Sequence, residues 1–240
     1  MTASKLRPAF AALVLLCAGA AQAVSLTGGG FTETFDSMGS SGTSNSTWTT
    51  TIPGNGTNSV ATMVAGTTNN NGFNAANLAP APATDRVLAT SPTTVSGGAL
   101  QLRLSNDTGA ALPGINIGYD TVRYRVTTTA NELPGYWLFY SLDGSSWSHV
   151  AGLTPTPTTV PNTLGVSPFG GSFYFTTPVA SNANFFLRWV DDNADQTAPD
   201  QIIGLNNLSV SAVPEPGAAT FLLAGLGVLL FMARRQRQEN

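Results

Sequence analysis

Apolar residues are spaced in two different ways along this chain. They form one continuous run over residues 10–20 and another over residues 217–233, whereas short stretches between the two runs alternate apolar and polar residues. Alternation is typical of β-strands that bury one face, and a continuous run beside basic residues is typical of a membrane-targeting segment. We therefore interpret the chain as one folded middle segment between two targeting segments.

The middle segment predicts an all-β fold. In residues 121–127, Val122 and Tyr124 fall on one face of a strand, and Arg123 and Arg125 fall on the face expected to meet solvent or a partner. Similar patterns predict strands at residues 100–104, 135–142, 146–150, 171–176, 184–190 and 202–210.

Turn residues separate these strands. Asp143 and Gly144 form a hairpin signal, because Gly adopts positive φ without a steric penalty. Residues 31–80, rich in Ser, Thr, Asn and Gly, predict an opening strand and a loop-rich excursion, and residues 153–168, with four prolines, predict an irregular connection. Many short strands separated by such turns favour a β-sandwich.

Composition limits the size, partners and chemistry of the middle segment. Residues 24–212 are enough for one domain with a substantial core. They carry five arginines and eleven acidic residues, a net charge of about −6, which argues against a nucleic-acid partner. The single cysteine, Cys17, lies in the first apolar run, so the middle segment has no disulfide, thiolate nucleophile or cysteine-bound metal.

Residues 1–23 predict a secretory signal peptide. Lys5 and Arg7 form a basic start, and the apolar run that follows is too short to span a bilayer. Ala21 and Ala23 then form the small-x-small pattern that signal peptidase accepts. We expect export through the Sec translocon and cleavage after Ala23.

Residues 213–240 combine a short motif, an apolar span and a basic end. The motif is Val213, Pro214, Glu215 and Pro216. As a helix, residues 217–233 would extend roughly 25 Å, at about 1.5 Å per residue, and so cross the inner membrane. The positive-inside rule keeps in the cytoplasm the stop-transfer residues Arg234, Arg235 and Arg237. The two prolines hold the backbone extended, which suits a segment that an enzyme must reach.

This order of motif, span and arginines resembles the PEP-CTERM sorting signal of exported proteins in Gram-negative bacteria that also make extracellular polysaccharide. The resemblance implies that an exosortase, a membrane-embedded enzyme, recognises residues 214–216 and cuts near them. It also implies anchoring in the inner membrane with the middle segment outside the cytoplasm, and then delivery to the cell surface or extracellular matrix. The alternative is a plain membrane anchor that is never cut.

A second resemblance covers most of residues 31–211. Residues 31–37, 102–109, 139–147 and 204–210 are similar, in this order, to a jelly-roll domain common in bacterial exported proteins. The resemblance implies a jelly-roll-like β-sandwich of lectin-like or carbohydrate-binding-like type, and it bears on fold more than on activity. Similar chains often carry Asp at positions occupied here by Asn206 and Asn207, so a metal site is not carried over.

Candidate catalytic groups are sparse in the middle segment. His149 is its one histidine, and no Gly-x-Ser-x-Gly pattern accompanies it, so we expect a partly exposed strand residue and not a catalytic base. Glycoside hydrolysis uses two carboxylates about 5 to 9.5 Å apart. Glu33 and Glu132, the glutamates of this segment, lie in no recognisable catalytic motif. A non-enzymatic protein is expected, with a surface glycan hydrolase as the alternative.

One acidic stretch has the ligand types that calcium prefers. Asp191, Asn193 and Asp195 alternate along the chain, and calcium takes hard oxygen ligands. The stretch has Gln196 and Ile202 where an EF-hand requires Gly and Glu. A solvated acidic loop is the favoured interpretation, calcium is the alternative, and no other cofactor is expected.

Aromatic side chains are the remaining candidates for ligand contact, because their faces stack on sugar rings. We expect core burial for each of the five candidates, which are Trp48, Tyr119, Tyr136, Trp137 and Tyr140. Trp137 and Phe139 share one face of their strand, opposite Tyr136, Leu138 and Tyr140, so at most one of these sets points outward. Trp147 is also expected in the core. The sequence therefore predicts an exported, non-enzymatic surface or matrix protein that associates with polysaccharide.

Overall fold

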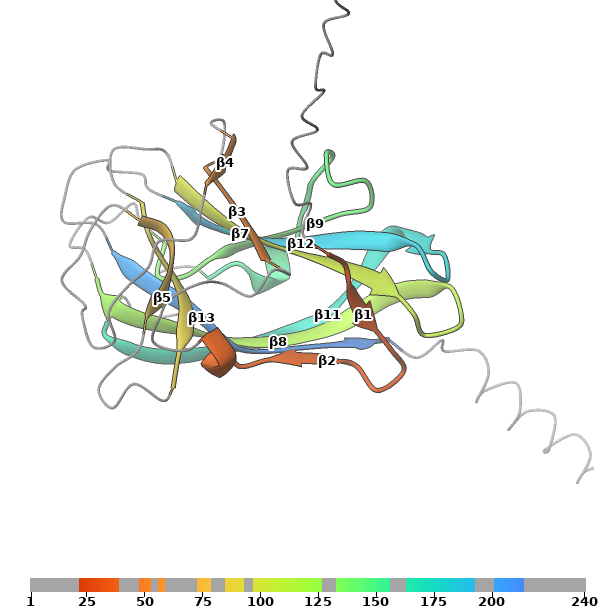
Figure 1. Cartoon of the computed structure of the whole chain (residues 1–240), viewed down its shortest axis with the longest axis horizontal. Helices are drawn as coiled ribbons and strands as arrows, with labels where there is room; N and C mark the ends of the chain where they lie inside the picture. Colours follow the sequence, from red (N-terminus) through yellow and green to blue (C-terminus); the bar gives the residue numbers. More distant parts are fainter. Residues whose placement is uncertain are drawn as a thin grey trace, which may run out of the picture.

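The computed structural model of the chain describes residues 22–38, 48–52, 56–58, 73–78, 85–92, 97–126, 133–155, 163–192 and 201–213. These residues form two β-sheets that pack face to face, with β3, β7, β9 and β12 in one layer and β2, β8, β11 and β13 in the other (Figure 1). The described helices are short 3-10 turns, η1 (Asp36–Met38) and η2 (Ala151–Leu153). The predicted all-β sandwich is confirmed.

The first sheet has seven strands, and β1 is parallel to β7 while the other pairs are antiparallel. Their order is β10 (Ser148–His149), β9 (Trp137–Ser141), β12 (Asn184–Asp192), β7 (Gly97–Asn106), β3 (Trp48–Ile52) and β4 (Gly56–Asn58), with β1 (Val24–Leu26) beside β7. The sequence patterns therefore predicted the strands of this sheet that follow residue 97 in the chain, which are β7, β9, β10 and β12.

The second sheet has six strands, all paired antiparallel. Their order is β11 (Gly165–Val179), β8 (Leu112–Arg125), β13 (Ile202–Ala212), β6 (Val87–Ser91) and β5 (Phe73–Leu78), with β2 (Phe31–Glu33) beside β13. The expectation of an irregular chain up to residue 168 is wrong from Gly165 onward, where β11 begins. Pro168 is tolerated there because β11 is an edge strand, which leaves one side of its backbone without a strand partner.

The hydrophobic core lies between the two sheets. Alternate residues of β12 point inward, and the Trp189 ring at the centre packs 5.5 Å from Trp48 of its own sheet and 6.0 Å from Tyr119 of the other, centroid to centroid. Burial of each large apolar side chain contributes about 1.5–3 kcal/mol, so the stability of this cysteine-free domain rests on these packed faces.

The predicted orientation of Arg123 is wrong. Alternation along β8 brings Tyr119, Thr121 and Arg123 inward, and it leaves Val122 and Tyr124 partly exposed. The sequence pattern does not decide which face of β8 is buried near residues 121–125, because both faces carry apolar or hydrogen-bonding groups there.

Backbone oxygens at the sandwich end hold the buried Arg123 guanidinium. It donates from Nε to the Thr163 carbonyl oxygen at 2.6 Å and from Nη1 to the Pro134 carbonyl oxygen at 3.4 Å. Nη2 donates to Ser167 Oγ at 2.9 Å, and burial lowers the pKa of the Arg123 guanidinium. These bonds compensate for desolvation of the charge.

Buried hydrogen bonds join the two sheets near the same end. Thr90 Oγ1 of β6 donates to Asp191 Oδ2 of β12 at 2.6 Å and lies 3.1 Å from the Tyr136 hydroxyl. That hydroxyl donates to the Ile203 carbonyl oxygen of β13 at 3.0 Å. Gln201 Nε2 donates to Asp191 Oδ1 at 2.9 Å. Burial is the main reason that the pKa of Tyr136 is raised well above its ordinary value.

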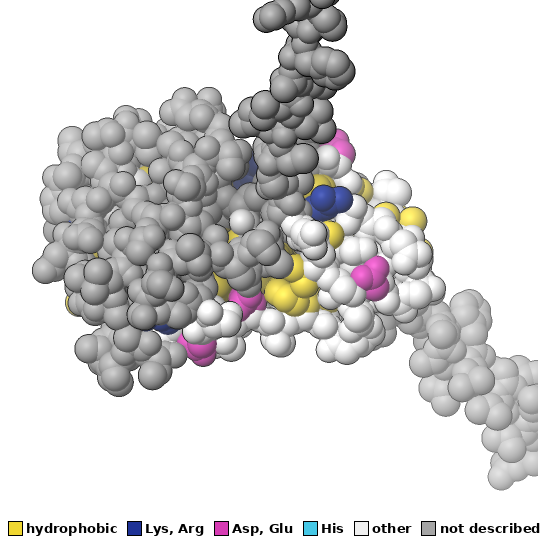
Figure 2. Space-filling model, in the orientation of Figure 1, with side chains coloured by type: hydrophobic (Ala, Val, Ile, Leu, Met, Phe, Trp, Pro, Cys, Tyr) yellow, Lys and Arg dark blue, Asp and Glu magenta, His cyan; other side chains and the backbone are white. Residues whose placement is uncertain are grey.

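The face shown in Figure 2 is mostly uncharged where it is formed by described residues. Charged side chains on it are few and are separated by uncharged polar groups and backbone. Among the described residues, no helix is long and apolar enough to cross a membrane. Residues 1–21, which include most of the predicted signal peptide, and residues 214–240, which include the predicted span, lie outside the described part of the chain.

Candidate functional site

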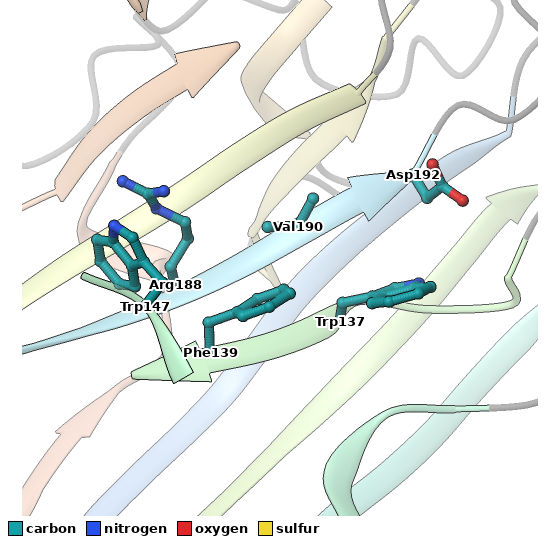
Figure 3. A pocket seen from close by; sticks show the side chains of 6 residues that line it. All are labelled: Trp137, Phe139, Trp147, Arg188, Val190 and Asp192. Carbon is teal, nitrogen blue, oxygen red and sulfur yellow. The ribbon is translucent and has the colours of Figure 1, made fainter. Parts of the chain in front are cut away.

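A groove of about 300 Å³ lies on the outer face of the first sheet, near its β10 edge. Figure 3 shows the arrangement of the side chains that line it, which are Trp137, Phe139, Trp147, Arg188, Val190 and Asp192. Trp147 and Arg188 lie at one end and Asp192 lies at the other. Trp137 and Phe139 follow one another along β9 between these ends.

Strand pairing determines which side chains meet in the groove. Phe139 of β9 lies opposite Arg188 of β12, and Trp137 lies opposite Val190. Directly opposite side chains on antiparallel strands have Cβ atoms about 4.5–5.5 Å apart. Each aromatic residue of β9 is therefore in contact range of a β12 side chain on the same face.

The rings of Trp137 and Phe139 form one flat wall. Their planes differ by 10° and their centroids are 6.4 Å apart. His149 of β10 packs against both rings, with centroids 5.3 Å from Trp137 and 5.1 Å from Phe139. The His149 ring is itself held by a 2.6 Å hydrogen bond between Nε2 and Thr154 Oγ1. The wall is thus supported by a third ring at the edge of the sheet.

Arg188 is fixed at one end of the groove by two neighbours. Its Cζ atom lies 3.6 Å from the centroid of the Trp147 ring. Its Nε and Nη2 atoms donate to Gln101 Oε1 of β7, at 3.2 and 2.8 Å. Burial lowers the pKa of the Arg188 guanidinium. The geometry is that of an oriented, partly desolvated cation beside an aromatic wall.

Asp192 provides an acceptor at the opposite end. Burial raises the pKa of its carboxyl above the ordinary value for Asp. A partly dehydrated carboxylate gains from hydrogen-bond donors such as the hydroxyl groups of a ligand.

The predicted Asp143–Gly144 hairpin turn is confirmed, but the predicted core position of Trp147 is wrong. Asp143 Oδ1 accepts hydrogen bonds of 2.7 Å from the backbone N–H groups of Ser145 and Ser146. Gly144 has φ +77°, and a Cβ atom there would lie 3.1 Å from two atoms of the Phe186 ring. This compact turn carries Trp147 across the outer face of the sheet, where it covers Arg188.

Four of the five aromatic candidates lie in the core as expected. Trp48, Tyr119, Tyr136 and Tyr140 are at most 6% exposed. Trp137 points outward together with Phe139, so the expectation of core burial is wrong for Trp137. The sequence analysis did not single out Phe139, Arg188 or Asp192 as ligand-binding residues, although the shared face of Trp137 and Phe139 was a usable signal.

The two carboxylates considered for hydrolysis are not brought together in the described structure. Glu33 Oε1 accepts a hydrogen bond from the backbone N–H of Phe35 at 2.8 Å, far along the chain from the groove residues. Glu132 lies outside the described residues. His149 is an exposed strand residue, as predicted, and its described contacts are the aromatic wall and Thr154.

Of the three residues predicted as calcium ligands, only Asp191 lies in the described part of the chain. Asp191 is fully buried, and its carboxylate accepts hydrogen bonds from Thr90 and Gln201 inside the sandwich, so it is not part of a solvated loop. Asn193 and Asp195 lie outside the described residues. Among the described residues, no group of three or more His, Cys, Asp or Glu side chains is placed to hold a metal ion. Calcium at this stretch stays a prediction.

Solved structures similar to this chain include three domains of low sequence identity. The CBM22-1 xylan-binding domain from Paenibacillus barcinonensis Xyn10C is 9% identical, with a TM-score of 0.39 over 77% of this chain and 94% of that domain. The cleaved adhesin domain of Lys-gingipain from Porphyromonas gingivalis is 12% identical, with a TM-score of 0.40 over 77% and 99%. TmCBM61 in complex with β-1,4-galactotriose is 7% identical, with a TM-score of 0.32 over 54% and 72%.

The C-terminal end matches a known sorting signal. No curated protein matches the sequence. Residues 212–238 match the PEP-CTERM protein-sorting motif, which confirms the resemblance stated from the sequence. The described chain ends at Val213, whose backbone N–H donates to the Gly114 carbonyl oxygen at 3.1 Å. The motif identifies the chain as an exported protein that carries an exosortase sorting signal, beginning where the last strand of the sandwich ends.

Proposed function

We propose that this protein is a non-enzymatic component of the cell surface or extracellular matrix that binds polysaccharide through the groove on the first sheet. Residues 1–23 direct export and are removed, residues 24–212 form a jelly-roll-like ectodomain, and residues 213–240 hold the chain in the inner membrane until an exosortase cuts near Pro214–Glu215–Pro216. The sorting motif supports the export route, and the geometry of the groove supports the ligand.

The flat wall of Trp137 and Phe139 is the observation that carries the ligand proposal. Sugar rings present C–H faces that pack on aromatic rings, and hydroxyl edges that need hydrogen-bond partners. Two rings with nearly parallel planes, 6.4 Å apart and side by side along one strand (Figure 3), present a surface for consecutive units of an extended glycan. Arg188 and Asp192 supply a donor and an acceptor at the two ends of the same groove.

The lining of the groove favours binding over hydrolysis. Asp192 is the one carboxylate among the described residues that line it, whereas glycoside hydrolysis uses a pair. A surface glycan hydrolase is therefore the second candidate, and an uncut membrane-anchored adhesin is the third.

Cosedimentation tests the ligand proposal. The full chain is produced in a host without an exosortase and is kept soluble in a zwitterionic detergent that has no sugar headgroup. It is then sedimented with insoluble or cross-linked extracellular polysaccharide from the native host. We expect retention by the polysaccharide and no release of reducing ends. Absence of retention would refute glycan binding, and release of reducing ends would establish the hydrolase.

Intact mass tests the sorting proposal separately. In the native host we expect a chain that begins at Val24 and ends near residues 214–216, found outside the inner membrane. Glu215→Ala should leave the full C-terminus in the inner membrane, while the matched change Glu239→Ala, beyond the arginines, should leave processing unchanged. A wild-type chain that keeps Asn240 in the inner membrane would instead establish the uncut anchor.

A further inference from the structure

The groove contains a cation without an anionic partner among the described residues. From this we infer that the polysaccharide it takes is acidic, and that the carboxylate of a uronic acid unit binds Arg188 while its ring stacks on the Trp137–Phe139 wall. This inference rests on the proposed glycan-binding function and adds the chemical class of the ligand.

Arg188 keeps hydrogen-bond donors for such a ligand. A guanidinium has five N–H donors, and the described structure uses two of them, one on Nε and one on Nη2, for Gln101 Oε1. Trp147 lies against the guanidinium, with its ring centroid 3.6 Å from Cζ, and so holds it in place without neutralising its charge. The remaining donors are those of Nη1 and the second N–H of Nη2.

Desolvation favours the binding of an anion by the Arg188 guanidinium, which has no anionic partner among the described residues. Burial lowers the pKa of Arg188, which reflects a charged form that has lost water without gaining an opposite charge. Within the groove, Asp192 is four residues further along β12, and about 3.3 Å per residue puts it roughly 13 Å away along the strand. That separation is too long for an ion pair, so the carboxylate at the far end does not satisfy Arg188.

The position of Arg188 beside Phe139 points to a carboxylate carried on a sugar ring. The two residues are directly opposite on neighbouring strands, so a ring stacked on Phe139 has its substituents within reach of the guanidinium. A carboxylate accepts two parallel hydrogen bonds from the planar fork of Arg, and the sulfated polymer in the test below separates this anion from a sulfate. A uronic acid unit provides the stacking face and the planar anion in one residue.

The acidic character of the whole domain does not oppose this binding at short range. Residues 24–212 carry about −6 in net charge, but charges farther away than about 8 Å are largely screened at physiological ionic strength. Among the described residues that line the groove, Arg188 is the one cation.

Paired polymers test the inference. The full chain, in the same sugar-free detergent, is titrated with polygalacturonate, alginate and glucuronan, each beside its carboxyl-reduced product, which keeps the linkage but has no charge. We expect at least one acidic polymer to bind roughly tenfold or more tightly than its reduced product, as one hydrogen-bonded charge pair would give. Arg188→Gln should remove that difference, because the acidic polymer then loses the charge pair that its reduced product never had.

Control variants make the outcomes distinct. Arg103→Gln removes an arginine from the same sheet face but not from the groove lining, so it should keep the preference, and circular dichroism checks that both variants fold. Equal binding of acidic and reduced polymers would overturn the inference while glycan binding stands. Tighter binding to dextran sulfate than to every uronate, or a preference that survives Arg188→Gln, would overturn the assignment to Arg188 and a carboxylate. Binding to no polymer of any pair would overturn the inference, whereas the proposed function is decided by cosedimentation with the polysaccharide of the native host.

Discussion

The guanidinium carbon of Arg188 lies 3.6 Å from the centre of the Trp147 ring, so the β9–β10 turn and strand β12 meet at one end of the groove. A partly buried cation–π contact of this kind contributes about 0.5–2 kcal/mol. We expect Trp147→Ala to lower the free energy of unfolding by about 0.5–2 kcal/mol and to weaken uronate binding several-fold, because Arg188 is no longer held in place. Trp147→Phe keeps an aromatic ring, so its stability and its uronate affinity should lie between those of the wild type and of Trp147→Ala. Chemical denaturation and titration measure both effects, and unchanged uronate affinity in Trp147→Ala would show that the stack does not position Arg188.

The aromatic wall leads to a second prediction. Trp137→Ala and Phe139→Ala should each weaken polysaccharide binding by about 2- to 10-fold, as expected from about 0.5–1.5 kcal/mol per aromatic contact. Tyr174→Ala is the matched control, because Tyr174 is 58% exposed on β11 of the other sheet. Affinity electrophoresis through gels that contain the polysaccharide compares the three variants. Equal retardation of all of them would place the glycan elsewhere.

The buried Tyr136 hydroxyl leads to a stability prediction. Tyr136→Phe removes the hydroxyl that donates to the Ile203 carbonyl oxygen and contacts Thr90, and it leaves that carbonyl without this donor. We expect a loss of about 1–3 kcal/mol in the free energy of unfolding, measured by urea denaturation. Tyr174→Phe, at an exposed position, should change it little. A neutral effect of Tyr136→Phe would mean that the hydroxyl does not help to join the sheets.

The Asp143 turn predicts a pH dependence of stability. Backbone donation from Ser146 and then Ser145, followed by the Ser146 and Ser141 side chains, lowers the pKa of the Asp143 carboxyl in the folded protein. A lowered folded-state pKa gives stability that is present above the unfolded value, about 3.9, and is lost as pH falls through the folded value. Asp143→Asn should therefore melt at a lower temperature than wild type near pH 7, and the difference should shrink in acid. A constant difference from pH 7 to pH 2 would argue against the carboxylate as its source.

Calcium is tested by a direct titration. Because Asp191 already accepts hydrogen bonds from Thr90 and Gln201, we expect millimolar calcium to leave the melting temperature of the full chain unchanged relative to a sample in EDTA. A rise with calcium that Asp195→Asn removes would restore the acidic stretch as a metal site.

Much of the fold could be predicted from the sequence, because alternation and turn residues are local signals. The strands β7, β9, β12 and β13 fall where the pattern put them, and the strand predicted at residues 121–127 overlaps only the end of β8. It was harder to predict which face of each strand points into the core. Arg123 and Trp137 were both assigned to the wrong side, since both faces of their strands carry apolar groups and only the packing of the other sheet decides between them.

The site was harder to predict than the fold for a related reason. Phe139 meets Arg188 through the pairing of β9 with β12, which are separated by the long strand β11 in sequence but adjacent in the sheet. Alternation showed that Trp137 and Phe139 share a face, but it carries no information about which strand lies beside them. Trp147 was misplaced because its position depends on the path of the turn after Gly144.

The place of β13 in its sheet determines how the protein bears a load. The strand that leads directly to the C-terminal end is bonded to β8 on one side and to β6 and β2 on the other. A force on that end acts along the strand. The hydrogen bonds on both flanks of β13 are then loaded together in shear. They cannot break one at a time, as they could if β13 were an edge strand that is peeled away. A domain held by this end is thereby attached through a strand that has bonded neighbours on both flanks.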